Sequence, residues 1–286
     1  MTDIVGCILP VVMNCLIPWI GGKVRLSSWI IPHFPEHTCY VEPFGGGASV
    51  LLNKDPSTVE VYNDVDRDVV QFFETVRDHG DELEEWVTHV PYSRELYTEW
   101  KRDYLAGEYP EDPVERAGRY FLIATGSMQG DKTTLNGLKA SRVSNRAKTW
   151  RNKVDQLEWF TERLRTVVIE SMDYADVLAK YDGPETLFYL DPPYVDVGDD
   201  YYQHEGEFRQ DEFAASLVDV EGYCVVSYGV DVPREITELV EEHGWCEVGK
   251  TTRQDTNREE VKERLFCNFD LEAETVSTPG ESVALS

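Results

Sequence analysis

The sequence has no cysteine pair at metal-binding spacing and no uninterrupted apolar run long enough to cross a membrane. Its six cysteines are scattered without a CxxC pair, which disfavours a zinc site or a disulfide framework and fits a reducing cytoplasm. The apolar stretch 4–20 contains Pro10, Asn14 and Pro18 and has no basic leader, so neither a membrane span nor a signal peptide is expected. We therefore predict a cytoplasmic protein with no metal site and no membrane partner.

Positive charge is also scarce. The 286-residue chain has 54 acidic and 27 basic residues, and its net charge is −27. Because 41% of the residues are hydrophobic and 12% are aromatic, this charge does not indicate disorder. We interpret it as a solvated acidic surface of the kind that keeps proteins soluble in concentrated salt, and we predict a halophilic source. Taken alone, the charge argues against nucleic acid as a partner.

Short apolar runs alternate with helical patterns, which predicts an α/β fold with a largely parallel sheet. Strands are expected over 39–43, 59–63, 167–170, 186–190, 223–227, 246–250 and 265–269. Helices are expected over 23–34, 48–52, 66–79, 211–218 and 234–243. The chain length suits one domain with an insertion or two small domains.

The alternation of strand and helix patterns stops between about residues 80 and 160. Helices are expected there over 84–90, 94–106 and 113–123, followed by a polar segment. A block without strands inside an alternating pattern predicts an inserted helical subdomain over 81–159, within a discontinuous α/β domain over 17–80 and 160–269. The acidic tail, 270–286, is expected to be disordered.

The most informative motif is Asp191-Pro192-Pro193-Tyr194, which follows the apolar run 186–190. Prolines cannot continue a strand, so they end it and fix the backbone at its carboxyl end. A carboxylate then lies beside a backbone carbonyl and an aromatic ring. This arrangement suits a planar group with an amino function, whose face stacks on the ring and whose NH2 donates to the oxygens. The alternative is a strand that ends in a proline turn with a surface tyrosine.

A glycine turn, Phe44-Gly45-Gly46-Gly47-Ala48, follows the first expected strand. Its glycines let the backbone turn sharply and bring a ligand close to the main chain. No Gly-Lys-Ser/Thr follows, so a phosphate-binding loop is not supported. Asp64 lies 17 residues beyond the glycines, where doubly wound folds place an acid that accepts hydrogen bonds from ribose hydroxyls. The alternative for Asp64 is the N-cap of the helix that starts near Asp66.

The segment before the first expected helix carries Trp19 and Lys23. Trp19 would supply an aromatic wall, and Lys23 or free N–H groups near the helix start would hold a carboxylate. A capping turn with a buried tryptophan explains the segment equally well.

These motifs, in this order, resemble the Dam-like (D12) class of DNA adenine-N6 methyltransferases over roughly residues 17–269. The resemblance implies a Rossmann-like methyltransferase sheet with helices on both faces, S-adenosyl-L-methionine as cofactor, and a mostly helical DNA target-recognition insertion. The family usually has Phe-x-Gly-x-Gly at the turn, whereas this chain has Ala48 at the last position. By position, the cofactor-binding residues would be Trp19, Lys23, Phe44, Gly46, Asp64, Asp173 and Asp191.

Several of these assignments keep an alternative. Asp173, in a segment that resembles the family's adenine-edge strand end, would equally serve as a helix N-cap. Tyr202, Phe208 and Phe213 are candidates for the wall of a target-base pocket, and ordinary core aromatics are the alternative. The segment 263–268 resembles the family's closing strand and is expected to be structural.

Asp191, Pro192, Pro193 and Tyr194 would carry the chemistry. The Asp191 carboxylate and the Pro192 carbonyl would accept both N–H bonds of an exocyclic amine and offset the charge that develops on its nitrogen. The base must leave the duplex, and Tyr194 would replace its lost stacking.

No cysteine follows a proline, so the thiolate needed for C5 methylation of cytosine is missing. Cytosine-N4 enzymes usually have Ser in place of Asp191, which favours adenine. The alternatives are a cytosine-N4 DNA or an RNA-adenine methyltransferase, or a catalytically silent DNA-binding homologue.

One window inverts the charge balance: residues 132–154 contain no Asp or Glu. Its basic side chains are interleaved with polar donors, as contacts to phosphates and base edges require, which predicts double-stranded DNA as the partner. A basic surface loop that pairs with acidic neighbours is the alternative. Arg142 and Arg146 are the best candidates. The full predicted DNA-binding set is Lys139, Arg142, Arg146, Lys148 and Arg151. The sequence is compatible with a cognate restriction nuclease and with its absence, and it defines no oligomeric state.

Overall fold

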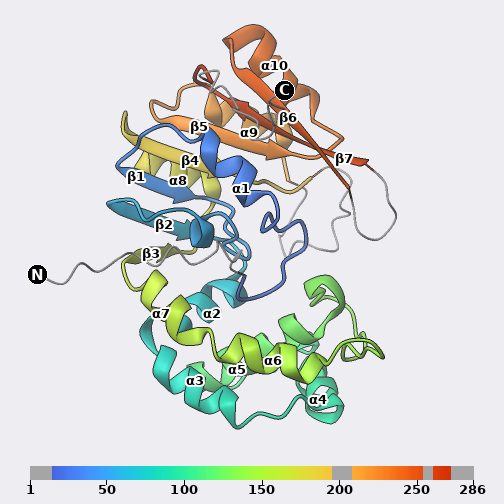
Figure 1. Cartoon of the computed structure of the whole chain (residues 1–286). Helices are drawn as coiled ribbons and strands as arrows, with labels where there is room; N and C mark the ends of the chain where they lie inside the picture. The colour runs from blue at the N-terminus through green and yellow to red at the C-terminus, as the bar shows by residue number, and fades with distance from the viewer. Residues whose placement is uncertain (1–14, 195–207, 254–259, 272–286) are drawn as a thin grey trace, which may run out of the picture.

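A single mixed sheet organises the chain, whose computed structural model describes residues 15–194, 208–253 and 260–271 (Figure 1). Its seven strands have the order β3-β2-β1-β4-β5-β7-β6. The strands are β1 (Cys39–Glu42), β2 (Val59–Asn63), β3 (Val167–Glu170), β4 (Thr186–Leu190), β5 (Tyr223–Tyr228), β6 (Cys246–Arg253) and β7 (Glu260–Cys267).

Five neighbouring strands, β3, β2, β1, β4 and β5, are parallel, and β7 and β6 continue the sheet antiparallel. Cys39 pairs with both Val59 and Thr186, so β1, β2 and β4 end at the same edge of the sheet. The order jumps from β1 to β4 at the centre. Ligands of doubly wound folds bind outside the carboxyl ends of the strands at such a switch point. The topology alone therefore places a site after β1 and β4.

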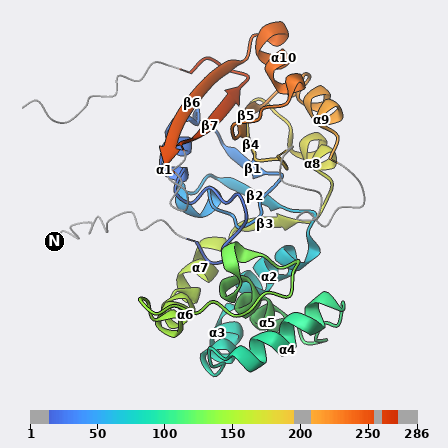
Figure 2. The same cartoon turned by 90° about the vertical axis from the view of Figure 1, so that its right-hand side faces the viewer.

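Helices cover both faces of the sheet. Alternate strand residues point to opposite faces, and the residues on both faces are buried under helices. Tyr40, Tyr62 and Leu187 belong to one core cluster, whereas Val41 and Phe188 belong to the other. The first cluster includes α1 (Ser27–Ile30), α2 (Arg67–Asp78) and α7 (Leu157–Leu164). The second includes α8 (Tyr174–Tyr181), α9 (Gln210–Leu217) and α10 (Arg234–His243), which Figure 2 shows on one side of the sheet. The predicted α/β fold with helices on both faces is confirmed.

A helical block lies beside the sheet, at the bottom of Figure 1. Residues 64–166 are all described and contain no strand. The block contains α3 (Gly80–Thr88), α4 (Arg94–Leu105), α5 (Pro113–Gly126) and α6 (Arg146–Val154). Asp112 begins α5 by accepting hydrogen bonds from two backbone N–H groups, and Pro113 at the first turn needs no such partner. The predicted boundaries of the insertion, 81–159, remain a prediction.

Several local predictions differ from the structure. The expected helix 23–34 is a turn followed by the short α1 and the 3₁₀ turn η1 (Ile31–His33), which carries Pro32 in its first turn. The expected helix 48–52 is an irregular turn followed by η2 (Leu51–Asn53). No helix was predicted for α6, α7 or α8. The buried side chains of α6 are only Trp150 and Val154, too few to give an apolar period.

Candidate functional site

One pocket lies at the switch point and gathers loops that are far apart in the sequence. It is lined by segments within 19–23, 42–50, 64–66, 130–133 and 189–194. The structure therefore brings together all but one of the predicted cofactor-binding and catalytic residues: Trp19, Lys23, Phe44, Gly46, Asp64, Asp191, Pro192, Pro193 and Tyr194.

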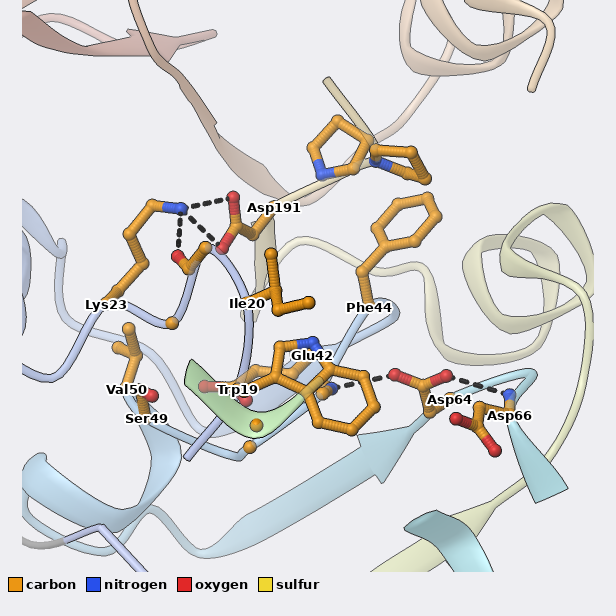
Figure 3. Close-up of a pocket in the computed structure, with 18 of the residues that line it drawn as sticks. Trp19, Ile20, Lys23, Glu42, Phe44, Ser49, Val50, Asp64, Asp66 and Asp191 are labelled. Carbon is orange, nitrogen blue, oxygen red and sulfur yellow. Dashed lines mark hydrogen bonds and ion pairs between the residues drawn. The ribbon is translucent and has the colours of Figure 1, made fainter. Parts of the chain in front are cut away.

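Asp64 lies at one end of the pocket. Its carboxylate accepts hydrogen bonds from the backbone N–H of Gly46 at 2.7 Å and of Asp66 at 2.8 Å (Figure 3). Burial and the nearby Asp66 carboxylate raise the pKa of Asp64 to about 6, against the effect of the two N–H donors. The capping role considered for Asp64 is taken by Asp66, which is the N-cap of α2 and accepts from the Asp68 N–H. Asp64 is thus left to face the pocket.

The glycine turn packs closely against two aromatic rings, those of Trp19 and Tyr62. Gly46 has φ +47°, and a Cβ there would lie 2.5 Å from Trp19 Nε1. A Cβ on Gly45 would lie 2.2 Å from the Tyr62 ring. Ala48 also has a positive φ, 53°, and its methyl group is fully buried. Ala48, which replaces the last glycine of the family pattern, therefore has a left-handed backbone conformation. This conformation is less favourable for alanine than for glycine by about 1 kcal/mol.

Lys23 and Asp191 form a buried ion pair at the other end of the pocket. Lys23 Nζ lies 2.8 Å and 2.7 Å from the two Asp191 oxygens and donates to the Gly21 carbonyl at 2.9 Å (Figure 3). Burial opposes the charge on Lys23, but Asp191 and Glu263 raise its pKa overall. Burial also raises the pKa of Asp191, against the effect of Lys23. Each carboxylate oxygen keeps a second lone pair, so Asp191 can still accept from a ligand.

The Asp-Pro-Pro-Tyr motif is held by side chains from β7 and α9. The Tyr194 hydroxyl donates to Glu263 at 2.9 Å, and its ring stacks on Tyr228 with centroids 5.5 Å apart. Gln210 donates to the Pro193 carbonyl at 3.0 Å. Among the described residues, none donates to the carbonyl of Pro192. That oxygen and Asp191 are therefore the acceptors that the loop offers to the pocket.

Asp173 is the predicted cofactor residue that the structure places elsewhere. It is exposed, is the N-cap of α8 through the Ala175 N–H at 2.8 Å, and does not line the pocket. The structure favours the capping alternative for this carboxylate. Phe213 is fully buried and, with Phe208, packs against the ring of Phe44. These two rings support the pocket from behind, and Tyr202 lies outside the described residues.

Four residues of the site were missed by the sequence reasoning. Glu42 and Tyr189 are strand residues, and both are buried in the pocket lining. A charged residue inside a buried strand is the signal that could have identified Glu42, whose pKa burial raises to about 7. Glu263 and Lys132 come from distant parts of the chain, and no local pattern marks them. From the sequence, Glu263 is expected in a structural strand and Lys132 in the basic window.

The basic window divides into structural and outward-facing side chains. Lys153 donates to the carbonyls of Cys15 and Leu16, and Arg151 donates to the Thr88 carbonyl. Lys139 is half-buried, and burial and the neighbouring cations lower its pKa. Three side chains are exposed and have neither an ion pair nor a hydrogen bond to a described residue: Arg142, Arg146 and Lys148.

Two absences concern the described residues alone. Within residues 15–194, 208–253 and 260–271, no three His, Cys, Asp or Glu side chains are grouped so that they could hold a metal ion. In the same ranges, no helix has both the length and the apolar character that crossing a membrane requires.

Comparison with known proteins shows which family the sequence matches. Residues 19–253 match the model of the D12 class N6 adenine-specific DNA methyltransferases. The chain is 27% identical over 187 residues to the DNA adenine methylase of Escherichia coli K12, and 30% identical over 190 residues to that of Salmonella typhi. Each alignment covers 64% of this chain and 65% of the relative, so the chain spans just under two thirds of their length. The Vibrio cholerae DNA adenine methylase is 23% identical over 77% of this chain and 79% of its own length.

Proposed function

This chain belongs to the D12 class of N6 adenine-specific DNA methyltransferases, and we propose that it transfers a methyl group from S-adenosyl-L-methionine to the N6 of a flipped adenine in double-stranded DNA. One observation carries the proposal. A single pocket at the switch point of the sheet joins a carboxylate suited to ribose hydroxyls, Asp64, to a carboxylate suited to an amine, Asp191.

The pocket suits S-adenosyl-L-methionine in charge and in shape. Four carboxyl side chains line it against two ammonium groups, which favours a ligand with a sulfonium and an amine. The glycine turn leaves the backbone bare beside Trp19. The hydroxyl of Tyr189 is buried and has no hydrogen-bond partner, so a ligand or a water molecule must satisfy it. Trp19, Lys23, Phe44, Gly46 and Asp64 would hold the cofactor, which supplies an electrophilic methyl group when bound.

The residues at the Asp191 end account for activation of the amine. The lone pair of an exocyclic amino group is delocalised into the base, so the nitrogen is a poor nucleophile. Asp191 and the Pro192 carbonyl would accept its two N–H bonds, which favours a pyramidal nitrogen and stabilises its developing positive charge. Tyr194 would stack on the extruded base, and its ring is fixed by Glu263 and Tyr228. Lys23 keeps the buried Asp191 carboxylate paired until the amine arrives.

The direct test is methylated-nucleoside analysis of DNA treated with the protein and labelled S-adenosyl-L-methionine at low and at molar KCl. We expect N6-methyladenine, with transfer retained in high salt because the acidic surface suits it. Labelled N4-methylcytosine would overturn the assignment of the base, and transfer to RNA alone would overturn that of the polymer. Absence of transfer at every salt concentration would favour a silent DNA-binding protein. Sequencing of modified adenines in a host that expresses the protein would define the recognition site.

We further propose that residues 81–159 recognise DNA through Arg142 and Arg146, with Lys139, Lys148 and Arg151 in support. Replacing both arginines by glutamine should weaken DNA binding. If both contact phosphates, the slope of log affinity against log salt should become shallower by about 2. Fluorescence anisotropy over a salt series measures both quantities.

Arg234→Gln is the matched control. Arg234 is exposed on α10, at the end of the molecule opposite the helical block (Figure 1), and it has an acidic partner of its own, Glu238. It removes one positive charge and should leave the slope unchanged. An equal loss per removed charge in the double variant and in the control would show a general charge effect and would refute the interface.

A further inference from the structure

Lys132 comes from the helical block, yet its ammonium group lies in the pocket of the sheet. It donates to Asp66 at 2.9 Å and to the Tyr120 hydroxyl at 2.7 Å, and it lies 4.2 Å from the centroid of the Trp19 ring. The Lys132 and Asp66 side chains are 12% and 14% exposed, so solvent screens this pair only partly. One cation therefore contacts both the aromatic wall and the residue that begins α2 beside Asp64.

The backbone that presents Lys132 is held tightly. Gly130 has φ +82°, and a Cβ there would lie 2.5 Å from the Pro18 carbonyl oxygen, so the loop lies directly against the segment that carries Trp19. The Asp131 carboxylate accepts from the N–H groups and the hydroxyls of Thr133 and Thr134. The fully buried Lys101 donates to the Asp131 carbonyl at 2.8 Å. Lys132 is thus presented from a fixed loop.

The Trp19 ring is held by contacts with the glycine turn and with Lys132. The glycine turn lies against it, since a Cβ on Gly46 or Gly47 would come within 3 Å of Trp19 atoms. Lys132 lies over the ring as a cation–π contact. Removing the ammonium group would free the ring and leave Asp66 without its ion pair, next to an already buried Asp64.

We propose that Lys132 is a positioning residue of the cofactor site, supplied by the helical block, which fixes Trp19 and Asp66 around S-adenosyl-L-methionine. The inference rests on the proposed function. If Lys132 has this role, the cofactor pocket is incomplete without the helical block, which also carries the basic window.

Titration of S-adenosyl-L-methionine and of S-adenosylhomocysteine into the full chain without DNA tests this role by calorimetry. Lys132→Met should weaken binding of both by about tenfold, because it removes a cation–π contact together with a largely buried ion pair. Lys132→Arg keeps the charge and can still stack on the indole, so it should stay within about threefold of the wild type. Lys180→Met is the matched control, because Lys180 also has an ion pair, with Glu170 at 2.6 Å, and a ring contact, with Tyr181, but does not line the pocket. This variant should leave cofactor affinity unaltered.

The dependence of affinity on pH is a second measurement. Asp66, Lys132 and Tyr62 are the charged or titratable side chains around Asp64. Burial and Asp66 raise the pKa of Asp64 to about 6, and Lys132 opposes them. Affinity should therefore fall as the pH drops through about 6 in the wild type, and at a higher pH in Lys132→Met.

The outcomes separate the two proposals. A wild-type protein that binds neither ligand rejects the proposed cofactor. A wild type that binds, together with a Lys132→Met variant that binds equally well with the same pH profile, rejects the role of Lys132. Equal losses in Lys132→Met and Lys180→Met would show a general charge effect and would also reject it. Should the methionine variant unfold, Lys132→Arg decides: a loss of tenfold or more in that folded variant would contradict positioning by charge.

Discussion

Asp191→Asn should lower methyl transfer by about 10²–10³-fold or more at saturating cofactor, while DNA affinity stays within about twofold of the wild type. The amide keeps the shape of the carboxylate but offers one acceptor oxygen instead of two and carries no charge. It cannot both pair with Lys23 and offset the positive charge on the amine. Asp191→Ala removes the group entirely and should abolish transfer. Single-turnover transfer to a DNA duplex measures the loss, and anisotropy measures DNA binding.

A loss of folding must be separated from a loss of chemistry, because Lys23 would keep only Glu263, 3.6 Å away, as an ion-pair partner. Asp68→Asn is the matched control: Asp68 is another buried carboxylate in an ion pair, with Arg116 at 2.7 Å, and it does not line the site pocket. Both variants should lose comparable stability, and Asp68→Asn should keep transfer. Near-normal turnover of folded Asp191→Asn would refute the role of the carboxylate. A loss that vanishes at high cofactor concentration would assign Asp191 to cofactor binding alone.

The sequence was sufficient for the parts of the site that are contiguous in the chain. Asp191 and Tyr194 follow a strand directly, and the glycine turn follows another, so their position at one edge of a parallel sheet was predictable from the alternating pattern. The same reasoning could not decide whether an acidic residue that follows a strand caps the next helix or binds a ligand. Asp64 and Asp173 have the same local pattern, yet only Asp64 faces the pocket, because Asp66 is available to cap the next helix.

The remaining parts depend on contacts that no local pattern specifies. Glu263 reaches Tyr194 only because β7 pairs antiparallel with β5. By sequence, Lys132 is one more member of a basic window, and only the approach of Gly130 to Pro18 brings it into the pocket at the switch point. The helix α6 was missed for a related reason. Its register is fixed by two buried residues and by the Asn145 cap rather than by an apolar face.

Gly46→Ala should remove detectable cofactor binding by the full chain, with an expected loss of affinity of about 100-fold or more. Part of the effect is conformational, since a left-handed φ of +47° costs alanine about 1 kcal/mol relative to glycine. The larger part is steric. The new methyl group would lie 2.5 Å from Trp19 Nε1 and 2.8 Å from two ring carbons. Either the turn opens or the indole moves into the pocket, and both outcomes displace the cofactor.

Gly244→Ala separates strain from collision. Gly244 has φ +72° at the end of α10, and no atom lies within 4 Å of the Cβ that alanine would add. In thermal or urea denaturation, Gly244→Ala should lose about 1 kcal/mol of the free energy of unfolding through strain alone, and Gly46→Ala should lose more because the collision with Trp19 adds to the strain. Only Gly46→Ala should lose S-adenosyl-L-methionine in calorimetry. If it binds as tightly as Gly244→Ala, the close approach of Trp19 to the glycine turn does not shape the cofactor site. The DNA-binding slope should be the same in both variants, because neither glycine lies in the basic window.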